Sequence, residues 1–99
     1  MKVKTNELIG AALDWAVGQA DECDLAPVEY STKWEFGGPI IEREQIAIYL
    51  SDHKEWTGLD GWNSGTGPTP LIAAMLCYVA GKLGDEVEVP DELLQGESK

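Results

Sequence analysis

The segment over residues 69–84 constrains the fold of this chain more than any other. Thr69 is a preferred N-cap residue, and Pro70 takes the first helical position, where a missing N–H costs nothing. Lys82 and Gly84 supply the expected end of a helix. The residues between are apolar around most of the circumference: Leu71, Ile72, Met75, Leu76, Tyr78, Val79 and Leu83. Such a helix is stable only when surrounded, so the pattern predicts a central core helix.

The N-terminal part predicts a strand followed by a second helix. Residues 1–5 alternate polar and apolar side chains, as in a short edge strand whose lysines discourage further strand pairing. Thr5 or Asn6 is the expected helix cap. Over residues 8–20 apolar side chains recur at spacings of three and four, which is typical of an amphipathic helix. The acidic cluster at residues 21–24 disfavours continuation, because it stands at the negative end of the helix dipole.

The middle of the chain predicts short strands and loops. Residues 28–31 suggest an extended segment, and Gly37-Gly38-Pro39 is expected to break regular structure. Residues 45–50 form the clearest strand because of their β-branched and aromatic content. Residues 51–67 are expected to be a loop that can include a short hairpin, and residues 87–90 a short extended stretch.

These elements predict an α+β fold, with two helices packed on a small, mostly antiparallel sheet. The length of 99 residues and 10.8 kDa supports one hydrophobic core, so residues 1–99 are expected to form a single domain. The acidic tail over about residues 91–99 can be flexible. A content of 43% hydrophobic and 25% charged residues is too apolar for a disordered chain.

Charge excludes several classes of partner. Eighteen acidic against seven basic residues give a formal charge of −11 and an isoelectric point near 4.2. Gripping DNA or RNA needs clustered Lys and Arg, and docking on an anionic membrane needs a basic surface. We therefore expect no direct nucleic-acid binding and no membrane binding. No apolar run approaches the roughly 20 residues of a membrane span, and no leader opens the chain.

Cysteine usage points to a reducing compartment. Cys23 and Cys77 are far apart in sequence and have no partner at metal-ligand spacing. A small secreted domain usually carries several paired cysteines, so the cytoplasm fits best. We interpret the two as small buried residues. Sequence alone leaves open whether they lie close enough to form a disulfide.

Several segments resemble the NinX-like proteins, a family of small proteins encoded by temperate phages of enteric bacteria. The resemblance is carried by residues 13–17 (LDWAV), 37–44 (GGPIIERE), 67–75 (GPTPLIAAM) and 77–79 (CYV), with residues 1–5 at one end and residues 83–87 and 89–90 at the other. It spans nearly the whole chain and departs from the family between Leu50 and Gly65. The resemblance implies an accessory phage protein in the host cytoplasm. It brings no established reaction and no catalytic set.

Arg43 is the only arginine and the first candidate for ligand binding. Its guanidinium offers a fork of donors suited to a phosphate or a carboxylate. The alternative is an ion pair with one of the eighteen acids.

The glycine-rich segment before the core helix is the second candidate. Free N–H groups at a helix N-terminus favour an anion, which makes Thr66, Gly67 and Thr69 candidate ligand contacts. It is not a nucleotide-binding P-loop, because the lysine of that motif is missing. The alternative is a helix cap with no further role.

Aromatic side chains in glycine-containing loops are the third candidate. Trp34, Trp56 and Trp62, with Phe36 nearby, could stack on a flat ligand or close a small core. His53 beside Asp52 could act as a general base, but no nucleophile pattern surrounds it, so an exposed loop histidine is the better interpretation. The acids over residues 85–92 lack the spacing of a calcium loop, and we predict no metal and no cofactor.

No catalytic constellation can be identified, so we predict a binding protein and no enzyme. The first hypothesis is sequestration of a small anionic, nucleotide-like host defence signal in a pocket formed by a homo-oligomer. The alternative is an acidic inhibitor that occupies a basic site on a host protein, for instance by imitating DNA. A weak hydrolase using His53 and Asp52 is third.

Overall fold

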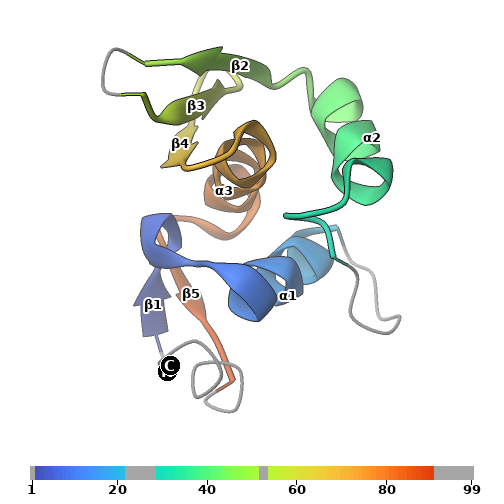
Figure 1. Cartoon of the computed structure of the whole chain (residues 1–99). Coiled ribbons are helices and arrows are strands. Elements are labelled where there is room, and N and C mark those ends of the chain that lie inside the picture. Colours follow the sequence, from blue (N-terminus) through green and yellow to red (C-terminus); the bar gives the residue numbers. More distant parts are fainter. Residues whose placement is uncertain (1, 22–28, 52–53, 91–99) are drawn as a thin grey trace.

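The computed structural model describes residues 2–21, 29–51 and 54–90. In chain order its elements are β1 (Lys2–Lys4), the short 3₁₀ helix η1 (Thr5–Glu7), α1 (Gly10–Ala20), α2 (Trp34–Glu44), β2 (Ala47–Leu50), β3 (Trp56–Leu59), β4 (Ser64–Gly67), α3 (Pro70–Leu83) and β5 (Glu86–Glu88). The predicted α+β class is confirmed, with helices and antiparallel strands around one central helix (Figure 1).

The central helix is α3, as the cap and the apolar pattern predict. Thr69 Oγ1 accepts a hydrogen bond from the Ile72 N–H at 3.1 Å, and Pro70 takes the first turn. Leu71 and every residue over 73–79 are buried. Because the other elements surround α3, this helix forms the middle of the hydrophobic core.

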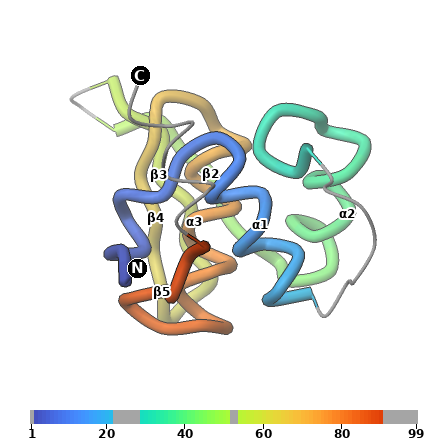
Figure 2. The backbone as a smooth tube through the Cα atoms, turned by 90° about the horizontal axis from the view of Figure 1, so that it is seen from below, coloured from blue at the N-terminus to red at the C-terminus, as the bar shows by residue number. Residues whose placement is uncertain are grey.

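The strands form two antiparallel sheets where the sequence suggests one. In the first sheet β1 pairs with β5, with Val3 opposite Val87. In the second the order is β2-β3-β4, so β4 is an edge strand. The predicted hairpin within residues 51–67 is formed by β3 and β4. The views in Figures 1 and 2 place α1 and α2 on one side of α3, and β1 and β4 on the other.

Strand β4 lies directly on α3 because Gly65 has no side chain. A Cβ atom at this position would lie 2.5 Å from the Cys77 backbone nitrogen and 2.7 Å from the Ala73 carbonyl oxygen. Neither backbone atom can move without disturbing α3. The glycine therefore fixes the distance between the strand and the helix.

Helix α2 contradicts the prediction that Gly37-Gly38-Pro39 breaks regular structure. The helix runs through all three residues, although an interior proline costs about 3 kcal/mol. Packing compensates, because Gly37 and Ile40 are buried. A Cβ atom on Gly37 would lie 2.6 Å from the Tyr30 carbonyl oxygen, so glycine allows the helix to approach the preceding turn.

The predicted strand at residues 28–31 is also wrong in its described part. Residues 30–32 form a turn, in which the Lys33 N–H donates to the Glu29 carbonyl at 3.0 Å. The Ser31 N–H donates to Asp14 Oδ1 on α1 at 2.8 Å, which ties the turn to that helix. Val28 lies outside the described residues.

Helix α1 begins at Gly10 and not at the predicted cap. Thr5 has another role: its hydroxyl donates to the Gly84 carbonyl oxygen, and its N–H donates to the Asp85 carbonyl at 2.7 Å. Its side chain is thus committed to joining η1 to the end of α3, and the chain enters α1 only after Ile9.

The structure places Cys77 among the fully buried residues, as predicted, whereas Cys23 lies outside the described part of the chain. None of the helices within residues 2–21, 29–51 and 54–90 is both long and apolar enough to cross a membrane.

Candidate functional site

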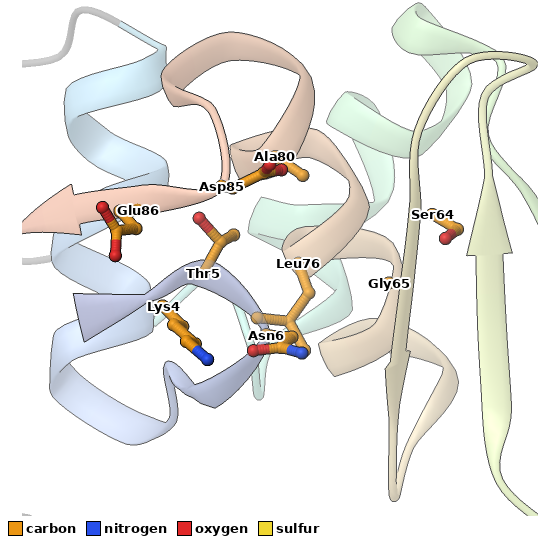
Figure 3. A pocket seen from close by; sticks show the side chains of 9 residues that line it. All are labelled: Lys4, Thr5, Asn6, Ser64, Gly65, Leu76, Ala80, Asp85 and Glu86. Atoms are coloured by element: carbon orange, nitrogen blue, oxygen red, sulfur yellow. The ribbon is translucent and has the colours of Figure 1, made fainter.

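An open cavity of about 630 Å³ lies between β4 and the N-terminal strand. We call it the β4 groove. Figure 3 shows β1 and η1 on one side, β4 on the other and α3 behind. Its lining residues are Lys4, Thr5, Asn6, Ser64, Gly65, Leu76, Ala80, Asp85 and Glu86. Leu76 and Ala80 of α3 form an apolar floor, and the remaining lining residues form mostly polar walls.

Among the residues that the structure describes, the backbone of β4 has no pairing partner along this side. The Asp60 N–H donates to the Asn63 carbonyl at 3.2 Å, so these two residues form a hydrogen-bonded pair at the end of the hairpin. Hydrogen-bonded and non-hydrogen-bonded pairs alternate along an antiparallel ladder. With Gly58 opposite Gly65 and Thr57 opposite Thr66, the N–H and C=O groups of Ser64 and Thr66 point away from β3. They face the free edge of the sheet.

The opposite wall of the groove is fixed and carries charge. Thr5 is buried, and its two hydrogen bonds hold η1 against the residues that follow α3. Lys4 and Glu86 stand opposite each other in β1 and β5, so their charges offset. Asp85 then leaves this wall net negative.

The β3–β4 turn presents Trp62 at the end of the groove lined by Ser64. The Asp60 carboxylate accepts hydrogen bonds from two backbone N–H groups, that of Trp62 at 2.9 Å and that of Asn63 at 2.7 Å. These bonds, the Trp62 contribution first, lower the pKa of Asp60. Cys77 Sγ donates to the Asn63 carbonyl at 3.4 Å, which anchors the turn to α3. Trp62 is nevertheless 94% exposed, so the turn is ordered while the indole lies in solvent.

Arg43 lies in a different cluster, which joins the ends of α1 and α2 to α3. Its Nη2 is 2.8 Å from Asp21 Oδ1 and 3.0 Å from the Tyr78 hydroxyl, and its Nε is 2.9 Å from Glu44 Oε2. The Tyr78 hydroxyl donates to Asp21 Oδ1 at 3.1 Å. The ion-pair interpretation of Arg43 is confirmed, and two carboxylates share its charge.

Burial and hydrogen bonding shift the pKa values of three groups on or beside α3. Desolvation, and after it the nearby Asp21 carboxylate, raises the pKa of Tyr78 to about 12. The hydrogen bond to Glu44, and after it that to Asp21, raises the pKa of Arg43 above its ordinary value. Desolvation also raises the pKa of Cys77 to about 11. Tyr78 and Cys77 are therefore neutral, and Arg43 charged, at physiological pH.

Four of the predicted ligand residues lie near the start of α3. Trp56 stands opposite Gly67 in the hairpin, and Thr69 follows two residues later. Trp56 is half-buried, Thr66 is exposed on the neighbouring position of β4, and the Thr69 hydroxyl already caps Ile72.

The other predicted residues lie elsewhere. Arg43 contacts Tyr78, which is nine residues along α3 from Thr69, a rise of about 13 Å. Trp34 is half-exposed on α2, and Trp62 is on the β3–β4 turn near the far end of α3. Arg43 and the helix N-terminus therefore do not form one site within a single chain. Asp52 and His53 lie outside the described residues.

Sequence reasoning missed the β4 groove. Its lining comes from four separate parts of the chain, and none of these parts carries a binding motif. The one available signal is the glycine at position 65, which the sequence predicts to lie in the loop over residues 51–67. In the structure it is the point at which β4 contacts α3.

In the part of the chain that the structure describes, no group of three or more His, Cys, Asp or Glu side chains is placed to hold a metal ion. The chain is thus a small, strongly acidic α+β protein, and its described residues form an open, polar-walled groove. A family model described as bacteriophage P22 NinX matches residues 4–82, and the chain belongs to this phage protein family. A search of curated proteins found no match.

Proposed function

We propose that this phage protein acts in the host cytoplasm by binding and without catalysis, and that its partner is a basic segment of a host protein. The observation that carries the proposal is the β4 groove, whose wall is net negative and whose edge strand offers unpaired backbone groups. The formal charge of −11 supports it, since a strongly acidic protein attracts basic surfaces over a distance and repels nucleic acids.

The state of Arg43 favours this function over capture of a small anion. An anion at Arg43 would have to displace Asp21 or Glu44, both of which already neutralise the guanidinium. The Arg43 guanidinium, which could otherwise bind an anion, is thus already paired with two carboxylates of the protein. The groove needs no such displacement.

A pull-down from host lysate at low and high salt tests the proposal. The Asp85→Asn/Glu86→Gln variant should lose the salt-sensitive partner, with binding about tenfold weaker at low salt. The matched control is Glu35→Gln/Glu42→Gln, which removes the same charge from exposed positions on α2. Equal loss in both variants would mean that overall charge, and not the groove, attracts the partner. No salt-sensitive partner at all would remove the proposal.

A small anionic, nucleotide-like ligand is the second candidate, favoured by the meeting of Trp56, Gly67 and Thr69 at the N-terminus of α3. Arg43 could join this corner only from another subunit, which requires a homo-oligomer. Calorimetry with nucleotides and cyclic dinucleotides tests the idea. Binding that Trp56→Ala abolishes would support it, and no heat across the panel would exclude it for those ligands.

A further inference from the structure

We infer that the β4 groove takes up an extended, basic peptide segment of a partner protein, which pairs with β4 and adds a strand to the β2-β3-β4 sheet. This inference rests on the proposed function and deepens it, because it names the conformation and the chemistry of the bound segment.

The first argument is the backbone of β4. The Ser64 and Thr66 N–H and C=O groups point to the free edge, and Ser64 borders the groove. An extended peptide supplies complementary groups at the same spacing, which is how strand addition gains affinity. Because the close approach of Gly65 to α3 fixes β4, its edge is in place before a peptide binds, which lowers the cost of ordering the site.

The second argument is the chemistry of the walls. Side chains of an added strand alternate between two faces, so one set would meet Leu76 and Ala80 while the other faced solvent. Asp85 gives the far wall a negative charge, because Lys4 and Glu86 of the same wall offset each other. An alternation of small apolar and basic residues matches this surface.

The third argument is Trp62. Its exposed indole is two residues before Ser64, on a turn that the Asp60 carboxylate holds in place. An exposed indole face suits a lysine or arginine that extends past the end of the groove. An exposed aromatic side chain on an ordered turn typically anchors a partner.

The charges disfavour a second copy of the chain as the occupant. Two molecules of charge −11 repel each other. An edge-to-edge contact would bring Ser64-Gly65-Thr66-Gly67 against itself, and this segment carries no basic side chain. A basic partner meets neither obstacle.

The test uses a blocked peptide of alternating Lys and Val, about eight residues long, with the full chain. Calorimetry gives affinity, and amide hydrogen exchange gives position. We expect binding that weakens with salt, and new protection of the Ser64 and Thr66 amides. Two matched peptides serve as controls, one with Glu in place of Lys and one N-methylated at its central residues. Each should bind at least about tenfold more weakly.

A variant separates backbone pairing from charge. Thr66→Pro removes one edge-facing donor at a position where an edge strand tolerates proline, and should weaken peptide binding by about tenfold. Circular dichroism establishes whether it folds. Should it not fold, the N-methylated peptide carries the same test with the wild-type protein.

Several results would overturn the inference: equal binding of the N-methylated peptide, protection elsewhere than Ser64 and Thr66, or edge protection that rises with protein concentration alone. The last would identify a second copy as the occupant. A partner captured through Asp85 and Glu86 whose binding survives Thr66→Pro would leave the proposed function standing and remove strand addition. Failure of the proposed function would instead show as the absence of any salt-sensitive partner.

Discussion

Polar groups on the two flanks of α3 differ in whether they are paired within the protein. On the flank toward α1 and α2, Arg43, Asp21 and Tyr78 satisfy one another through contacts of 2.8 to 3.1 Å. On the flank toward β1, the edge of β4 and the carboxylate of Asp85 border an open groove. The first flank is closed by its own side chains, and the second is left open.

The difference shows that the guanidinium of this strongly acidic chain lies on the closed flank. The only guanidinium joins three helices together and is half-exposed, with carboxylates on either side. The open flank keeps an excess of acid. The closed flank therefore stabilises the fold, and the open flank is the surface on which the proposed partner would bind.

Loosening the contact between β4 and α3 should have the largest effect on stability. Gly65→Ala places a Cβ atom 2.5 Å from the Cys77 nitrogen, so we expect a loss of about 3 kcal/mol in the free energy of unfolding. Urea denaturation measures it. The control is Gly38→Ala on α2, where the nearest atom is 3.9 Å away and alanine favours the helix. Equal stability of the two variants would mean that the wall of the groove is not fixed.

The closed flank should weaken at alkaline pH. Because the folded pKa of Tyr78 is raised from 10.0 to about 12, its neutral form contributes stability that is complete below pH 10 and lost as pH rises through 12. The expected loss is about 3 kcal/mol. It is measured by comparing the wild type with Tyr78→Phe across this range. Parallel pH profiles of the two proteins would contradict the assignment.

At neutral pH the Tyr78 hydroxyl stabilises the fold, so the same substitution should be destabilising there. Tyr78→Phe leaves Arg43 and Asp21 paired but removes the hydroxyl between them, so we expect the free energy of unfolding to fall by about 1 kcal/mol. Tyr49→Phe is the matched control, since Tyr49 is 48% exposed on β2 and should change stability by a few tenths of a kcal/mol at most. Thermal unfolding resolves the difference, and identical melting temperatures would argue against a closed flank.

On the open flank, one substitution should weaken peptide binding and leave stability unchanged. Trp62 is 94% exposed, so Trp62→Ala should alter the free energy of unfolding by less than about 0.5 kcal/mol. Binding of the Lys-Val peptide should nevertheless fall several-fold, because the indole is an anchor beside the groove. Calorimetry and urea denaturation on the same preparation measure both. A large loss of stability would show that Trp62 packs against the protein.

The sequence predicts elements whose stability is local, and misses those that depend on distant contacts. The start of α3 follows from Thr69 and Pro70 alone, since the cap and the ring act within one turn. The glycines and proline of α2 give an equally strong local signal, yet the burial of Gly37 and Ile40 overrides it. Local propensity is a weak guide wherever tertiary packing decides.

The candidate site was harder to predict for the same reason. One arginine among eighteen acids can have many partners. Glu44 is its neighbour on α2, but only the arrangement of three helices selects Asp21. The β4 groove exists because two sheets lie on one side of α3 without meeting. Residue types alone do not encode that spacing.

Hydrogen exchange of the β4 amides in the protein alone tests the central claim most directly. If the outer edge of β4 is unpaired, the Ser64 and Thr66 amides exchange rapidly while the Gly65 and Gly67 amides, which face β3, are protected. Protection of all four amides at low protein concentration would show that the edge is already covered and would contradict the account.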